Sequence, residues 1–443
     1  MSITTSGNPT TAQAQSTTPG LRLFQMGVEG ASAADSVNLF RGEVGFPLTL
    51  LSLENRGGLK TEITLNYGSA IDPAVTTFNQ AAPTGIAGMG WSLPYEMILL
   101  DFQGSGSPAD DSYYLATSDG ARSKLWPTGQ ANIGAPNEVW TFEVESYRFQ
   151  SISYSPPRQL WTIIEADGSM RIYGADVANG DSPAALRTAI KWGGVSGNWT
   201  GASSRTQGQQ SFTIGWNLAK VVNAWGGEIL YTYSSFLDDE VRIGGTGGLT
   251  YTRASYLLSI ADPTGRTVTF NYLAKTYDQT ADANGITIRE YEPPHALQGS
   301  GPWPYQDRYE TRYLDSITVT QTQNSVTSNV TTLRFAYSID LLADTSVVPG
   351  NPAYLYKRYL RGITAVSASG KLLPGPRFDY YTGQENINAP VHRGALKAMT
   401  LATGGTIRYY YEQQAIPDTA LDLTITSSEP NWVTGQLRFF PRT

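Results

Sequence analysis

Three stretches of the chain share one pattern of apolar and polar positions and can be aligned without a gap. They run from 218 to 233, from 257 to 272 and from 396 to 411, and each is apolar at offsets 0, 3, 11 and 13, with glycine at offset 8 and tyrosine at offset 15. The leucine, glycine and tyrosine positions are Leu218, Gly226 and Tyr233; Leu257, Gly265 and Tyr272; and Leu396, Gly404 and Tyr411. Two alternating runs around a glycine predict a β-hairpin, and the repetition indicates that one hairpin is reused.

Two further copies keep the start of this pattern and carry insertions between their strands. Leu314 and Ile317 keep offsets 0 and 3, as do Leu360 and Ile363. An isolated hairpin is only marginally stable, so each copy must pair laterally with the next. The sequence therefore predicts an array of antiparallel hairpins over 211–443.

The part of the chain before this array also alternates. Runs at 46–53 and 59–67 flank the turn Asn55-Arg56-Gly57-Gly58, and Asp167-Gly168 separates two further apolar runs. Such turns between alternating runs favour hairpins. We predict a β domain over 21–175.

Two segments lack this alternation. Residues 1–20 are polar and of low complexity, which predicts a disordered amino-terminal tail. Residues 176–210 are rich in Gly and Ser, which predicts a surface excursion, with a short helix near Ala184 to Lys191.

Composition agrees with many short strands and narrows the function classes. The 443 residues include 45 Gly, 26 Tyr and only 16% charged residues. A net charge of −7 argues against nucleic-acid binding, and the absence of cysteine excludes disulfides and thiolate metal sites. No apolar run suits a Sec signal peptide or a membrane span, so we expect a protein that is cytoplasmic before export and leaves without a Sec signal.

The segment Gly85-Ile86-Ala87-Gly88-Met89-Gly90-Trp91-Ser92-Leu93-Pro94 resembles the GLGWSLP signature of the Rhs/YD-repeat family. The matching positions are Gly88, Gly90, Trp91 and Pro94. The opening around Val37 to Leu48 and the final hairpin from Leu396 to Thr406 are also similar to elements of that family.

This resemblance implies an all-β fold, a long antiparallel hairpin array that forms part of a spiral, cage-like shell. In this family, which includes the B and C components of Tc toxin complexes and SpvB-type amino-terminal domains, the shell encloses a toxic polypeptide. The sequence contains no recognisable self-cleaving core and no toxin domain after the array. The expected partners are therefore the remaining carboxy-terminal shell and core, a toxin domain in the same or a separate chain, and a delivery or translocation component.

Candidate chemistry in the sequence is sparse. His295 and His392 stand alone without metal-ligand spacing, and no G-x-S-x-G motif is present. Glu143 and Glu145 have an E-x-E spacing that a solvated strand face explains equally well, and Asp110-Asp111 suits a solvated loop. We predict no catalytic residue, no cofactor and no metal, and therefore no enzyme.

Two other functions remain open from the sequence. The first is a surface or adhesion module that binds a glycan or a receptor through Trp192, Trp199 and Trp303 in the excursions. The second is an enzyme within 21–173 that uses Glu143 or Glu145.

Overall fold

The computed structural model is almost entirely β-structure, which confirms the predicted all-β class. It describes residues 3–6, 20–26, 37–38, 43–68, 84–101, 111–118, 121–128, 138–145, 149–191, 210–236, 240–242, 250–275, 308–344, 354–382 and 394–411. Within these ranges the helices are single 3-10 turns, η2 (Arg56–Gly58), η6 (Val177–Asn179) and η7 (Pro183–Ala185). None of the helices in this described part is long and apolar enough to cross a membrane.

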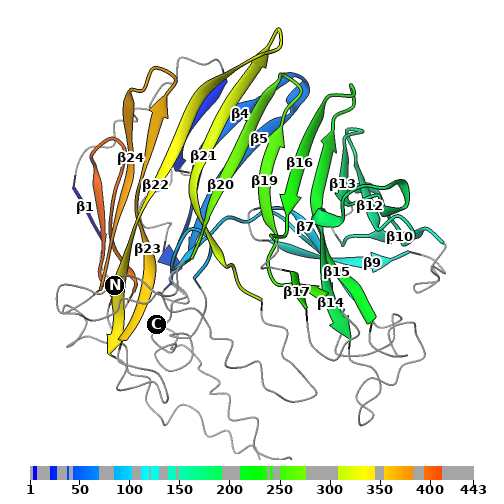
Figure 1. Cartoon of the computed structure of the whole chain (residues 1–443), viewed down its shortest axis with the longest axis horizontal. Helices are drawn as coiled ribbons and strands as arrows, with labels where there is room; N and C mark the ends of the chain where they lie inside the picture. Colours follow the sequence, from blue (N-terminus) through cyan, green and yellow to red (C-terminus); the bar gives the residue numbers. More distant parts are fainter. Residues whose placement is uncertain are drawn as a thin grey trace, which may run out of the picture.

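The hairpin copies form one continuous curved sheet, which we call the wall (Figure 1). Its strands are β15 (Gln210–Val222), β16 (Glu228–Ser234), β19 (Tyr256–Ala261), β20 (Arg266–Ala274), β21 (Arg312–Gln323), β22 (Val326–Asp344), β23 (Tyr354–Ser367), β24 (Leu372–Tyr380), β25 (Leu396–Thr400) and β26 (Thr406–Tyr409). Each strand pairs antiparallel with the one before it. Within the described residues, the predicted antiparallel, lateral pairing of the hairpins is confirmed, and residues 412–443 of the predicted array lie outside them.

The far end of the wall carries a strand from the opposite end of the chain. Strand β1 (Ile3–Ser6) pairs antiparallel with β26, although it lies in the tail that the sequence predicts to be disordered. A separate two-stranded sheet of β17 (Glu240–Arg242) and β18 (Thr250–Thr252) is inserted in the chain between β16 and β19, which pair directly with each other.

At its other end the wall joins a closed ring of strands. The ring contains β7 (Met97–Asp101), β8 (Ser112–Ala116), β9 (Arg122–Pro127), β10 (Trp140–Glu143), β11 (Phe149–Ser155), β12 (Leu160–Glu165) and β13 (Met170–Gly174), paired in chain order. Both β7 and β13 pair with β15, which closes the ring. Aromatic rings pack in its centre: the Trp161 ring stacks on Tyr154 with 4.7 Å between centroids and meets Trp216 edge to face at 5.8 Å.

The short helix predicted near Ala184 to Lys191 is wrong over most of its length. After the single turn of η7, residues Leu186–Lys191 form strand β14, which pairs with β15. The exposed backbone of the long strand β15 offers partners that a lone helix would lack, and the β-branched Thr188 and Ile190 favour a strand.

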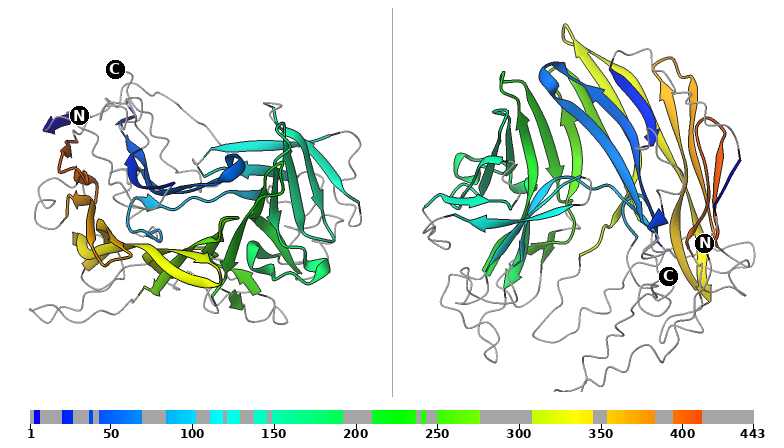
Figure 2. Two further views of the ribbon diagram at one scale, coloured as in Figure 1. Left: turned by 90° about the horizontal axis from the view of Figure 1, so that it is seen from above. Right: turned by 180° about the vertical axis from the view of Figure 1, so that it is seen from behind.

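A second sheet lies on the concave side of the wall, and we call it the inner sheet (Figure 2). It contains β2 (Leu21–Met26), β3 (Val37–Asn38), β4 (Glu43–Glu54), β5 (Lys60–Gly68) and β6 (Trp91–Ser92). The predicted hairpin of β4 and β5 is confirmed. The expected domain over 21–175 therefore supplies two sheets, the inner sheet and the ring.

The hydrophobic core lies between the wall and the inner sheet. Alternation along β5 buries Ile63 and Leu65, while Lys60 and Glu62 are exposed. From the wall, residues such as Ile317 and Leu360 are fully buried in the same cluster. Each such side chain contributes about 1.5–3 kcal/mol, so the two layers stabilise each other.

Candidate functional site: the tyrosine–leucine junctions and the signature segment

A single hydrogen bond closes every copy of the repeat. We call the tyrosines of the five copies the hairpin tyrosines and the leucines at offset 0 the hairpin leucines. In each copy the tyrosine hydroxyl donates to the leucine carbonyl oxygen of the same copy. The pairs are Tyr233 to Leu218 at 2.8 Å, Tyr272 to Leu257 at 2.8 Å, Tyr337 to Leu314 at 2.6 Å, Tyr380 to Leu360 at 2.8 Å and Tyr411 to Leu396 at 3.0 Å.

The backbone of a hairpin tyrosine contacts the next copy. Tyr233 stands opposite Leu257 and Tyr272 opposite Leu314, with a β-bulge at each position. Tyr337 and Tyr380 repeat this arrangement. A hairpin tyrosine therefore joins two copies, one through its hydroxyl and one through its backbone register.

Tyr233 and Tyr380 are buried and the other three hairpin tyrosines are half-buried, and burial away from water disfavours the ionised form of a tyrosine. It raises the pKa of Tyr233, Tyr272 and Tyr380 well above the usual value of 10.0. The hydroxyls thus remain protonated donors over the physiological range.

The glycines at offset 8 lie in turns whose backbone has positive φ. The φ angles are 80° at Gly226, 82° at Gly265 and 91° at Gly404. In the copy that begins at Leu314, Asn324 and Ser325 provide the positive φ instead. This copy keeps the turn conformation without a glycine, because asparagine also tolerates positive φ.

The segment 84–96, which we call the signature segment, runs along the inner side of the wall. Gly88 and Gly90 have φ angles of 89° and 79°. The Met89 amide donates to the Arg358 carbonyl oxygen at 2.8 Å, and a Cβ at Gly88 would lie 3.0 Å from that oxygen. Glycine is therefore required both by conformation and by the close approach of two backbones.

Trp91 connects the signature segment to a hairpin tyrosine. Its indole N–H donates to the Tyr380 hydroxyl at 2.7 Å, and its ring lies 4.7 Å from that of Phe378. Trp91 is 2% exposed, so its polar N–H needs this partner. Pro94 is half-buried in the link from β6 to β7.

The backbone amides of two hairpin leucines donate hydrogen bonds to carbonyl oxygens of the signature segment. The Leu314 amide donates to the Ile86 carbonyl at 2.8 Å and the Leu218 amide to the Glu96 carbonyl at 2.9 Å. These contacts bring together sequence-predicted residues that lie far apart in the chain. The signature segment therefore holds the starts of several copies.

The inner sheet supplies a further acceptor of this kind. The amide of Leu396 donates to the Tyr67 hydroxyl at 2.9 Å. Tyr67 is not among the site residues predicted from the sequence, where it ends the alternating run 59–67.

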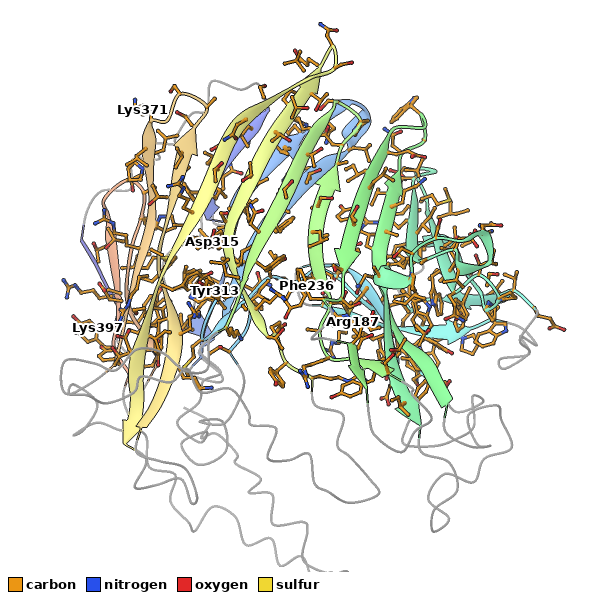
Figure 3. The ribbon with its side chains drawn as sticks, viewed as in Figure 1. Arg187, Phe236, Tyr313, Asp315, Lys371 and Lys397 are labelled. Atoms are coloured by element: carbon orange, nitrogen blue, oxygen red, sulfur yellow. The ribbon has the colours of Figure 1, made fainter. Side chains whose placement is uncertain are left out.

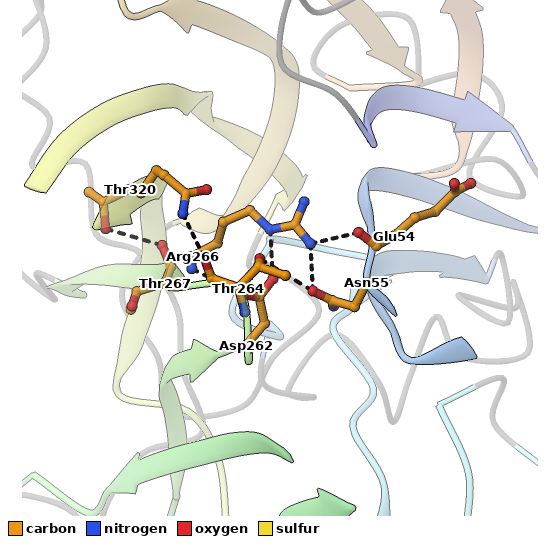
Figure 4. Close-up of polar contacts among 8 residues, drawn as sticks. Glu54, Asn55, Asp262, Thr264, Arg266, Thr267 and Thr320 are labelled. Atoms are coloured by element: carbon orange, nitrogen blue, oxygen red, sulfur yellow. Dashed lines mark hydrogen bonds and ion pairs between the residues drawn. The ribbon is translucent and has the colours of Figure 1, made fainter. Parts of the chain in front are cut away.

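A buried ion pair makes a second connection between the layers (Figure 4). The Arg266 guanidinium, 5% exposed, contacts the Asp262 carboxylate at 2.6 Å, the Glu54 carbonyl at 2.8 Å and the Asn55 side chain at 2.7 Å. It joins the turn of one copy to the turn between β4 and β5. The sequence signal for this pair is an acidic and a basic residue, Asp262 and Arg266, on either side of Gly265.

Stacked cations add contacts near the lower ends of the wall strands (Figure 3). The Arg312 guanidinium lies 3.8 Å from the centre of the Phe236 ring, and that of Arg358 lies 3.7 Å from the Tyr313 ring. Arg358 is buried and Arg312 is half-buried, so the aromatic faces compensate part of the hydration that each guanidinium loses.

Glu143 and Glu145 are the candidate catalytic residues that the structure describes. Glu143 and Glu145 are exposed at the end of β10, on either side of the buried Val144. The described residues contain no group of three or more His, Asp or Glu able to hold a metal. The other candidates lie outside the described residues: Asp110, Trp192, Trp199, His295, Trp303 and His392.

Comparison with solved structures finds distant similarity. The TcdB2-TccC3-Cdc42 crystal structure matches with a TM-score of 0.44 and 15% identity, over 76% of this chain and 16% of that chain. The N-terminal domain of the effector SpvB from Salmonella typhimurium strain LT2 matches with a TM-score of 0.39 and 14% identity, over 71% and 96%. The Photorhabdus luminescens Tc holotoxin pore matches with a TM-score of 0.42 and 13% identity, over 75% and 16%.

No family model and no curated protein sequence matches the chain. The chain spans about a sixth of the TcdB2-TccC3 chain that it matches. The similarity to Tc toxin and SpvB structures is therefore a structural one, at a level that assigns neither a family nor an activity.

Proposed function

We propose that the chain is a non-enzymatic wall segment of a toxin-related β shell that encloses a polypeptide cargo. The observation that carries this proposal is the repeated junction, in which a tyrosine such as Tyr233 closes its own hairpin and pairs with the next leucine. A single type of lateral contact allows a sheet to grow by addition of hairpins, as in other repeat proteins.

The surface of the inner sheet that faces away from the wall suits a cargo that must be released. It carries exposed Lys60 and Glu62, which form an ion pair, and Arg22 forms a second pair with Glu54 at 3.1 Å. Because these four charges cancel, they supply little net field to attract a polypeptide. We place the cargo on this side.

The proposed partners follow from the same role. They are the remaining shell and core, a toxin domain in the same or a separate chain, and a delivery component. We propose export without an amino-terminal signal sequence, after assembly in the cytoplasm.

The test is to co-express the chain with the polypeptide encoded directly downstream of it in the genome. We expect co-purification, hollow particles by negative-stain electron microscopy, and digestion of the second polypeptide at least about 10-fold more slowly than when it is free, since local access to protease limits cleavage. The matched control mixes the two polypeptides after separate purification, when a formed wall can no longer be filled. Equal digestion rates in both preparations would refute the proposal.

A further inference from the structure

The contact between β1 and β26 copies the register of the other junctions. We call the pairing between the last strand of one copy and the first strand of the next a junction. At each junction the residue two positions before the hairpin tyrosine pairs with a residue of the next copy. That partner lies three positions after the hairpin leucine of the next copy. The pairs are Tyr231 with Ile260, Phe270 with Ile317, Phe335 with Ile363 and Phe378 with Met399. Tyr409 stands two before Tyr411, and the residue opposite it is Ile3.

The sequence of β1 matches this position as well. Ser2-Ile3-Thr4 repeats Ser316-Ile317-Thr318 residue for residue, and both strands run antiparallel to the strand before them. β1 therefore takes the place of the first strand of a further hairpin, although it comes from the other end of the chain.

The pairing of β1 with β26 lacks one residue pair that every junction between two copies has. Its register ends at Tyr409, whereas the earlier junctions extend to the hairpin tyrosine opposite the next leucine. A strand that carries the leucine as well can form that additional pair and should bind the same edge more strongly.

We propose that β1 is an exchangeable cap and that the edge of β26 binds the first strand of a further hairpin of the same pattern, Leu-x-Ser-Ile-Thr, supplied by a partner polypeptide. A bare edge strand pairs readily with other chains, so a self-derived cap prevents uncontrolled association until the partner arrives. The proposal concerns the edge alone and holds whether or not the wall encloses a cargo.

The test uses the absence of cysteine from the chain. Thr4 and Arg408 stand opposite each other, and Cα atoms of antiparallel pairs lie at about 4.5–5.5 Å, a separation that a disulfide spans. The double variant Thr4→Cys, Arg408→Cys should lock the cap when oxidised. The probe is a fluorescent peptide with the sequence of β21, Arg312–Gln323, and its binding is followed by anisotropy.

We expect the reduced double variant to bind the peptide at least about 10-fold more tightly than the oxidised one, because apparent affinity scales with the uncapped fraction. Deletion of residues 1–6 should tighten binding relative to the unaltered chain by a similar factor. A peptide with Ile317→Asp should bind neither protein. In the control lock, Ser259→Cys with Thr269→Cys inside one hairpin, oxidation should leave peptide binding unchanged.

Equal peptide affinity of the oxidised and reduced cap locks would overturn the proposal, and so would the absence of binding in both. This comparison uses one and the same protein in two redox states, so it decides the question even if the chain without residues 1–6 fails to fold.

Discussion

The hydroxyl of Tyr233 donates a 2.8 Å hydrogen bond to the carbonyl oxygen of Leu218, the residue that begins the same hairpin. Its ring is 5% exposed and its backbone stands opposite Leu257 of the next hairpin. One residue thus sets the length of its own hairpin and the register of its neighbour.

Removing this hydroxyl should weaken the protein. Tyr233→Phe keeps the ring and leaves a buried carbonyl without its donor, so we expect the free energy of unfolding to fall by about 1–2 kcal/mol. Urea denaturation followed by tryptophan fluorescence measures the change. Tyr410→Phe is the matched control, since that ring is 42% exposed, and it should have no measurable effect. Equal stability of both variants would count against the role of the bond.

Two turn glycines should differ in their tolerance of alanine. Both Gly265 and Gly404 have positive φ, but a Cβ at Gly265 would lie 2.6 Å from the Thr322 carbonyl oxygen, while nothing lies within 4 Å at Gly404. Gly404→Ala should cost about 1–2 kcal/mol from backbone conformation alone. Gly265→Ala should lower the free energy of unfolding by about 1–3 kcal/mol more, because the backbone at Thr322 must shift to make room for the Cβ. Thermal unfolding of the two variants decides this, and indistinguishable midpoints would contradict it.

Loss of Arg266 should be among the most damaging single changes. Arg266→Met leaves the buried Asp262 carboxylate without its cation, and we expect a loss of about 3–5 kcal/mol in the free energy of unfolding. Lys220→Met breaks an exposed pair with Glu228 and should cost at most about 1 kcal/mol. Adding Asp262→Asn to Arg266→Met should restore part of the loss by removing the uncompensated charge. If the second change instead deepens the loss, burial of the charge is not the cause.

Stability should fall at alkaline pH. Burial raises the pKa of Tyr233, Tyr272 and Tyr380 in the folded state above 10.0, so above about pH 10 the unfolded chain loses protons that the folded chain keeps. The free energy of unfolding should therefore be unaffected by these groups below about pH 9. Above pH 10 each buried tyrosine should lower it by about 1.4 kcal/mol per pH unit.

Urea midpoints at pH 8, 10 and 11 measure this alkaline effect. Tyr380→Phe should reduce the slope between pH 10 and 11. A midpoint that stays constant to pH 11 would show that the tyrosines ionise in the folded state.

The sequence predicted the hairpins well because their signals are local. Alternation around Gly226 or Gly265 reports both the strands and the turn within sixteen residues. The contacts between the layers have no such signal. Tyr67 and Leu396 are 329 positions apart, and the sequence around either residue does not indicate that the two are in contact.

The same reason explains the two segments whose structure differed. Ile3–Ser6 is short and flanked by polar residues, and only the edge of β26 gives it a partner. Leu186–Lys191 is a strand because β15 extends beyond β13 and accepts it. In both cases a distant strand edge determines the conformation, which is a tertiary effect that local propensity cannot report.

The position of the signature segment also bears on the order of folding. Residues 84–96 precede every hairpin of the wall in the chain, and contacts from this segment reach Leu218, Leu314 and Arg358. During synthesis the segment leaves the ribosome first, so each new hairpin meets a template that is already present. Long-range strand pairing is otherwise slow to nucleate. Translation from the amino terminus thus converts a search over the whole wall into a series of short steps, one hairpin at a time.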